Sequence, residues 1–98
     1  MEIRYGGEDL RRLAVDPAYE GGHSPAIVKV YRKRVQLIQN AADERDFYAL
    51  KSLHYEKLKG ARANQRSMRL NEKWRLVLEI TDGATGKYVH IVAIEDYH

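Results

Sequence analysis

Residues 74–94, with the sequence WRLVLEITDGATGKYVHIVAI, decide the fold. From Trp74 to Ile80, apolar residues at every second position alternate with Arg75, Val77 and Glu79, and a period of two predicts a β-strand. Residues 88–94 are apolar on both parities, which predicts a second strand covered on both of its faces. Between the two strands, the glycine-containing stretch 82–86 predicts a loose hairpin connection.

A further strand is expected just before this pair. Met68 and Leu70 alternate with Ser67 and Arg69, so that one parity is apolar and the other is polar. The Asn-Glu-Lys stretch at 71–73 separates this strand from the next and predicts a tight hairpin turn. The second half of the chain is therefore expected to form a small, mostly antiparallel and twisted sheet.

The first half begins with a short strand or extended lead at residues 1–5, which two glycines end. Leu10, Leu13 and Ala14 then share one face of a short helix, with acidic residues in its first turn. The Asp16-Pro17 pair ends this helix, and a glycine-rich loop follows.

The longest helix is predicted to start at Ser24, which suits the N-cap, with Pro25 at the first helical position. Its end is expected near Asn40-Ala41, and a short helical turn is expected from Asp43 to about Leu50. One buried stripe repeats at intervals of three and four residues and comprises Val28, Tyr31, Val35, Ile38 and Ala42. The predicted class is α+β, with N-terminal helices packed on the sheet in a single domain over residues 1–98.

Composition limits the class of protein further. The chain has 98 residues, 44% of them hydrophobic, and no cysteine, which excludes a thiol nucleophile and a cysteine zinc site. Residues 1–5 lack the apolar core of a signal peptide, and no apolar run approaches the roughly 20 residues that cross a bilayer. We therefore expect a cytoplasmic protein with no membrane partner.

The charge is unevenly distributed. The segment from Lys57 to Arg75 contains seven cationic residues and the single acid Glu72. Such a strip favours a polyanionic partner or an acidic protein partner, although a solvated basic face is an equally good explanation from charge alone.

Several side chains could move protons around a phosphate. Cleavage of RNA by its own 2′-hydroxyl needs a base, an acid and positive charge at the phosphate. The candidates are the histidines His54 and His98, the cations Lys57 and Arg75, and the terminal pair Asp96 and Tyr97. Four of them also have an ordinary explanation. His54 would be partly buried beside a strand, and Asp96 would pair with Arg69 or Arg75. Tyr97 would pack against the sheet edge, and His98 would be disordered as a last residue. Zinc or iron could instead bind His54, Asp96 and His98, but the cationic surroundings disfavour a metal ion.

Three ordered segments resemble a known family. These are LHYEKLKG at 53–60, SMRLNEKWRL at 67–76 and EDYH at 95–98. Together they resemble the HigB-like branch of the RelE/ParE toxin superfamily, the toxins of bacterial type II toxin–antitoxin pairs, also called plasmid maintenance killer proteins. The resemblance implies the RelE-like microbial RNase fold.

The resemblance also implies an activity. Members are ribosome-dependent endoribonucleases that cut messenger RNA in the decoding site by attack of the 2′-hydroxyl, without metal or other cofactor. The family's active-site positions fall on His54, Lys57, Arg75, Asp96, Tyr97 and His98. General contacts to messenger and ribosomal RNA would come from Lys59, Arg62, Arg66, Arg69 and Lys73.

The family also implies a protein partner, a helix-turn-helix antitoxin of the HigA type, which the basic face or the exposed side of the Pro25–Asn40 helix could contact. Two rival functions exist on the same scaffold. The ParE-like branch inhibits DNA gyrase without catalysis, and a degenerate toxin would be retained only to bind its antitoxin. The histidine, lysine and terminal Asp-Tyr-His set favours the nuclease over both.

Overall fold

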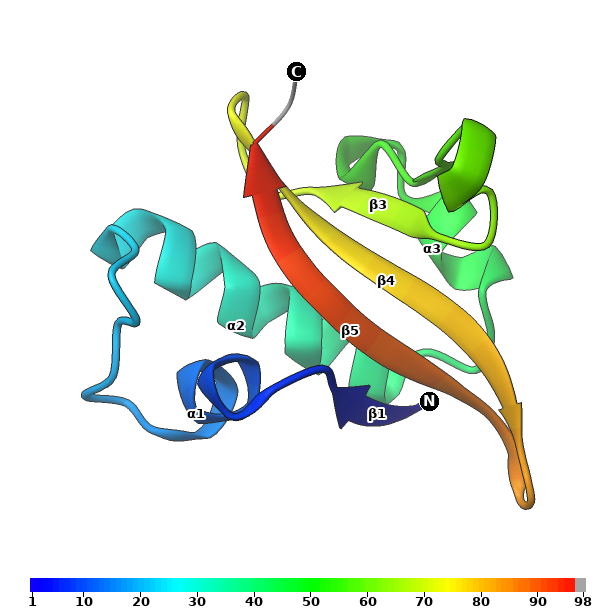
Figure 1. The fold of residues 1–98 in the computed structure, drawn as a ribbon, viewed down its shortest axis with the longest axis horizontal. Coiled ribbons are helices and arrows are strands. Elements are labelled where there is room, and N and C mark those ends of the chain that lie inside the picture. The colour runs from blue at the N-terminus through cyan, green and yellow to red at the C-terminus, as the bar shows by residue number, and fades with distance from the viewer. Residues whose placement is uncertain (97–98) are drawn as a thin grey trace.

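A computed structural model describes residues 1–96 as helices in the first half and strands mainly in the second (Figure 1). The α+β class is confirmed. The elements are β1 (Glu2–Tyr5), α1 (Glu8–Val15), α2 (Pro25–Asn40), α3 (Arg45–Ala49), the 3₁₀ turn η1 (Lys51–Leu53), β2 (Glu56–Lys57), the 3₁₀ turn η2 (Gly60–Arg62), β3 (Arg66–Arg69), β4 (Trp74–Gly83) and β5 (Gly86–Asp96).

The strands form one five-stranded sheet in the order β1-β5-β4-β3-β2. The pairs β2–β3, β3–β4 and β4–β5 are antiparallel, which confirms the mostly antiparallel sheet. The pair β1–β5 is parallel and joins the two ends of the chain. Figure 1 shows the long β4–β5 hairpin crossing the molecule, with α1 and α2 beside it.

One core lies between the helices and one face of this sheet. The helices contribute the buried residues Leu13, Val28, Tyr31, Ile38 and Phe47. The strands contribute Met68, Leu76, Leu78, Val89 and Ile91 from the face that we call the helical face. The other side of the sheet, which we call the open face, carries charged residues, although Ser67 and Val77 on this face are fully buried.

The helix α2 follows its sequence signals. Ser24 Oγ accepts a hydrogen bond from the Ile27 amide at 3.3 Å, and Pro25 is the first helical residue. The predicted stripe is buried from Val28 to Ile38, but its last member was wrong. Ala42 is exposed, because extended backbone at Ala41 (φ −74°, ψ 143°) ends the helix before the stripe is complete.

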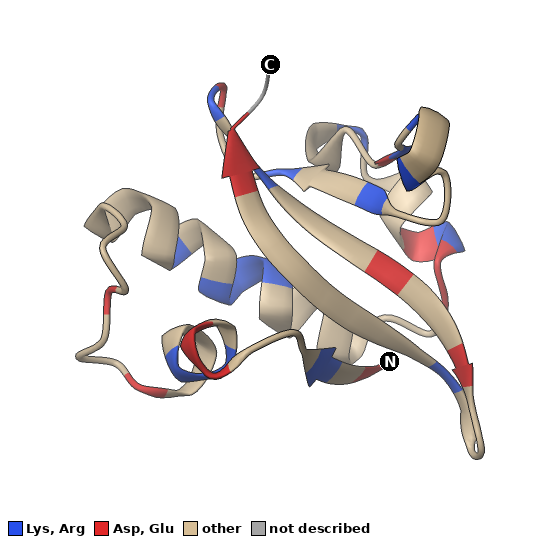
Figure 2. Ribbon diagram, in the orientation of Figure 1, with Lys and Arg blue, Asp and Glu red and all other residues tan. Residues whose placement is uncertain are grey.

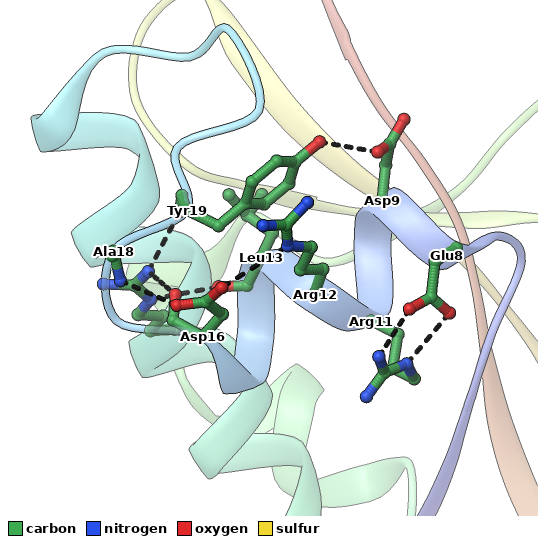
Figure 3. Close-up of polar contacts among 9 residues, drawn as sticks. Glu8, Asp9, Arg11, Arg12, Leu13, Asp16, Ala18 and Tyr19 are labelled. Atoms are coloured by element: carbon green, nitrogen blue, oxygen red, sulfur yellow. Dashed lines mark hydrogen bonds and ion pairs between the residues drawn. The ribbon is translucent and has the colours of Figure 1, made fainter.

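The loop after α1 is fastened by polar contacts (Figure 3). Asp16 Oδ1 accepts from the Ala18 amide at 3.0 Å, and the Tyr19 hydroxyl donates to Asp9 at 2.6 Å. Arg32 of α2 donates to the carbonyl oxygens of Leu13, Asp16 and Tyr19. These bonds hold α1 and its loop against α2. Within residues 1–96, no helix has the length and apolar character to span a membrane.

The two predicted turns have different outcomes. The tight turn at 71–73 is confirmed, because Asn71 Oδ1 accepts from the amides of Lys73 and Trp74. The connection at 82–86 is tighter than expected, since Gly83 pairs with Gly86 and only two residues lie between them.

A β-bulge in β5 changes which side chains face the core. Val77 pairs with Ala93 while Leu78 pairs with Ile91, so Val92 is an extra residue. Paired residues point to the same face, which places Ile94 on the helical face with Ile91 and Glu95 on the open face. The bulge therefore partly explains why apolar residues occupy both odd and even positions in residues 88–94, because the positions that face the core change at the bulge.

Candidate active site on the open face of the sheet

A row of charged residues crosses three neighbouring strands on the open face. Arg69 of β3 pairs in register with Arg75 of β4, which pairs with Glu95 of β5. Figure 2 shows the acidic end of β5 beside cationic residues of β4 and β3. Two adjacent guanidinium groups repel each other unless an anion is nearby, and Glu95 supplies that negative charge.

His54 lies at the Arg69 end of this row. It follows η1 and has left-handed backbone (φ 47°, ψ 45°), a conformation that costs energy for a residue other than glycine. Its Nε2 atom lies 3.1 Å from Arg69 Nη1. A guanidinium can only donate, so Nε2 is the acceptor and the neutral ring carries its proton on Nδ1. His54 is exposed, so the expectation of an ordinary partly buried histidine was wrong.

Two hollows adjoin these residues. One, of about 240 Å³, is lined by His54, Glu56, Arg69 and Glu72. The other, of about 410 Å³, is lined by Glu56, Lys57, Leu58, Lys59, Arg62 and Arg75, and we call it the cationic hollow. Two of the predicted site residues, His54 and Arg69, thus line the first hollow, four line the cationic hollow, and Glu56 borders both.

Glu95 was not singled out from the sequence, yet it organises the cationic hollow. Arg62 donates to both of its carboxylate oxygens, at 2.9 and 2.8 Å, and Arg75 Nη2 lies 3.6 Å away. The hydrogen bonds from Arg62, with a smaller contribution from Arg75, hold the pKa of Glu95 below its usual value. Its sequence position beside Asp96 was visible, but the pairing with Arg62 depends on the fold.

Arg66 lies apart from the cationic hollow. Its Nε donates to Glu44 at 3.0 Å, and the Tyr55 hydroxyl donates to the same oxygen at 2.6 Å. The Arg66 side chain is 16% exposed, so little of it is available to a partner. Burial, followed by the hydrogen bond to Glu44, raises the pKa of Tyr55, which therefore acts as a neutral donor.

The remaining predicted residues are in three situations. Lys73 is exposed at the β3–β4 turn, with its ammonium 5.5 Å from the centre of the Trp74 ring. Asp96 is half-buried and stands opposite Trp74 in the sheet register. Tyr97 and His98 lie outside the described residues. Across residues 1–96, no group of three histidine, aspartate or glutamate side chains is arranged to hold a metal ion.

The whole chain superposes on a solved toxin structure. A YoeB/ParE toxin from Agrobacterium tumefaciens matches with a TM-score of 0.58, at 16% identity, over 100% of both chains. The chain has the fold of a YoeB/ParE toxin. A toxin–antitoxin complex, RelBE2 from Mycobacterium tuberculosis, matches with a TM-score of 0.49 at 16% identity, over 98% of this chain and 96% of that chain. No protein-family model and no curated protein sequence matches this chain.

Proposed function

We propose that this protein is a toxin of the RelE/ParE superfamily, of the HigB-like branch, and a ribosome-dependent messenger RNA endoribonuclease. The observation that carries the proposal is the cationic hollow lined by Lys57 and Arg75, which shares Glu56 with the hollow lined by the exposed His54. The likeness to a toxin fold supports it, as do the three motifs of the resemblance.

The proposed reaction is an in-line displacement within the RNA. The 2′-oxygen forms a bond to phosphorus while the bond from phosphorus to the 5′-oxygen breaks, which leaves a 2′,3′-cyclic phosphate and a 5′-hydroxyl. A base takes the 2′-hydroxyl proton, and an acid gives a proton to the leaving oxygen. Either His54 or His98 serves as the base, and Lys57 and Arg75 stabilise the charge on the phosphate.

The other predicted residues would support binding and geometry. Asp96 would orient a neighbouring imidazole, and Tyr97 would stack on or position a base. Lys59, Arg69 and Lys73 would contact phosphates of messenger and ribosomal RNA, which fixes position but reads no sequence. The guanidiniums of Arg62 and Arg66 are already paired with Glu95 and Glu44, and each pair is neutral overall, so these two arginines would contribute less to RNA binding than the other cations.

We place the antitoxin on the opposite side of the molecule. The exposed side of α2 carries Lys29 and Lys33, and α2 contains no acidic residue. A groove of about 390 Å³ runs beside them and is lined also by Pro17, Ala18, Glu20, Pro25, Val28, Arg32 and Gln36. Such a surface suits an acidic segment of a helix-turn-helix antitoxin.

Induced expression in bacteria tests the proposed function. Wild type should arrest growth and create new messenger RNA ends with 5′-hydroxyls inside translated regions. His54→Ala and His98→Ala should abolish those ends, while His90→Ala, a histidine to which no role is assigned, should not. Arrest without new ends that survives both substitutions would favour the gyrase inhibitor, and absence of arrest would favour a degenerate toxin.

A further inference from the structure

We infer that Arg62 and Glu95 are positioning residues, a tether that fixes the shape of the cationic hollow and does not itself bind RNA. This inference rests on the proposed function for its catalytic consequence, and on the geometry alone for the tether. The pair joins the segment 58–65, which we call the basic loop, to the end of β5, next to Asp96.

Each of the three nitrogens of the Arg62 guanidinium donates a hydrogen bond within the protein. Its Nε donates to Gln65 Oε1 at 2.8 Å, while Nη1 and Nη2 donate to Glu95 at 2.9 and 2.8 Å. A bidentate pair of this kind fixes orientation as well as distance. An RNA phosphate would have to break these bonds before it could use the same donors.

A second contact fastens the basic loop to the sheet. Gln65 Nε2 donates to Glu79 Oε2 at 3.2 Å, and Asn64 donates to the same oxygen at 3.4 Å. Since Glu79 and Glu95 both lie on the open face, the loop is held against β4 and β5.

The tether acts on the residues proposed to hold the phosphate. Lys57 and Lys59 flank Leu58, whose amide donates to the Gln65 carbonyl at 3.0 Å, so the segment that carries both lysines is bonded to Gln65. The same Glu95 carboxylate lies 3.6 Å from Arg75. One carboxylate therefore sets the spacing between the cations of the loop and the cation of β4.

The pair is too exposed to be a major source of fold stability. The side chains of Arg62 and Glu95 are 40% and 33% exposed, and ion pairs at such exposure contribute little to folding. Loss of the tether is therefore expected to change the geometry of the hollow while the fold persists.

A double-mutant cycle tests the inference with Arg62→Gln, Glu95→Gln and the double variant. Single-turnover cleavage of messenger RNA on bacterial ribosomes gives the catalytic readout, and amide hydrogen exchange of residues 58–65 gives the structural one. Each single variant should cut on the order of tenfold more slowly, and the double variant no more slowly than the slower single. Exchange should rise alike in all three. Asp43→Asn removes a comparable exposed ion pair, with Arg45, and should match wild type in both readouts.

Other outcomes contradict either the tether or the proposed function, and they can be told apart. If Arg62 binds RNA directly, Arg62→Gln slows cleavage further in the Glu95→Gln background. If Glu95 competes with the phosphate, Glu95→Gln binds RNA more tightly and cuts faster. If wild type cleaves RNA but neither the cleavage rate nor the hydrogen exchange changes in the variants, the inferred tether is wrong and the proposed nuclease function is unaffected. If wild type does not cut but exchange still rises in the variants, the proposed function is wrong and the tether stands.

Discussion

His54 Nε2 accepts a hydrogen bond from Arg69 Nη1 at 3.1 Å, so the lone pair that would take a proton from a 2′-hydroxyl is already engaged. For His54 to act as the base, Arg69 must first move away from the ring. Arg69 is itself a cation proposed to contact phosphate, and the bound RNA would draw it away. The substrate would in this way release the base that acts on it.

The engagement of Nε2 can be measured without RNA. Arg69→Ala should increase the rate at which a histidine-acylating reagent modifies His54, because the ring nitrogen loses its donor. Mass spectrometry of the modified protein would follow each histidine separately. His23, whose ring packs edge-on against Trp74, serves as the internal control and should react at an unchanged rate. An unchanged rate at His54 would show that Arg69 does not occupy Nε2 in solution.

The left-handed backbone at His54 predicts a conflict between stability and activity. A backbone φ of 47° is unstrained for glycine but strained for alanine. His54→Gly should therefore have a free energy of unfolding about 1 kcal/mol higher than His54→Ala. Urea unfolding measures this difference, provided that the free energy of unfolding falls with urea concentration at the same slope in both variants. Both variants should lose cleavage if His54 is catalytic. Equal stability of the two would mean that the backbone at residue 54 relaxes in solution.

Substitution of Ser67 is expected to increase stability, which is unusual for a buried residue. Its side chain is fully buried, and within residues 1–96 its Oγ has no hydrogen-bond partner. Removing an unsatisfied buried hydroxyl removes a desolvation cost, so Ser67→Ala should be neutral or up to about 1 kcal/mol more stable. Ser24→Ala is the matched comparison. There the hydroxyl caps α2, and its loss should cost about 1 kcal/mol by thermal or urea unfolding.

Gly6 and Gly7 make a second matched pair. A Cβ on Gly6 would lie 2.7 Å from the Ile91 carbonyl oxygen, which accepts the Gly6 amide, so Gly6→Ala must push β1 away from β5. We expect a loss of about 1–3 kcal/mol in the free energy of unfolding. Gly7 has nothing within 4 Å of such an atom, and Gly7→Ala should change stability by less than about 0.5 kcal/mol. Equal effects would contradict the close approach of β1 to β5.

Glu95 predicts a dependence of stability on pH. Its pKa is lowered from the usual 4.5 by Arg62, so its contribution is present above about pH 4.5 and is lost as the pH falls through the lower folded-state value. Because the pair is partly exposed, wild type should exceed Glu95→Gln by no more than about 1 kcal/mol near pH 6. That difference should shrink as the pH falls below about 4.5. A difference that stays constant with pH would show that the ion pair between Glu95 and Arg62 does not contribute to stability.

Local sequence signals predicted most of the elements but not the contacts between distant ones. The cap at Ser24, the turn at Asn71 and the strand alternation each depend on residues a few positions apart, and the structure has all three. The parallel pairing of β1 with β5 joins residues more than 80 positions apart and leaves no local pattern.

The candidate site shows the same division. The residue types of the site could be predicted, and His54, Lys57, Arg69 and Arg75 do meet around two adjoining hollows. The sequence could not predict which of these cations are paired with acids. The pairs Arg62–Glu95 and Arg66–Glu44 form only once the sheet register is set. The cationic strip of the sequence is therefore partly neutralised in the folded protein.

The extra residue in β5 decides which face of the sheet carries the charged row. If Val92 were kept but paired regularly, uninterrupted alternation from Ile91 would exchange the faces of Glu95 and Asp96. Relatives could lengthen or shorten the turn end of the hairpin by paired residues and leave the charged row intact. A single deletion at Val92 would remove the bulge and leave the row on the open face, whereas a single insertion between Ile91 and Glu95 would invert it. We therefore expect natural insertions to accumulate near Gly83–Gly86 and to be rare beyond the bulge.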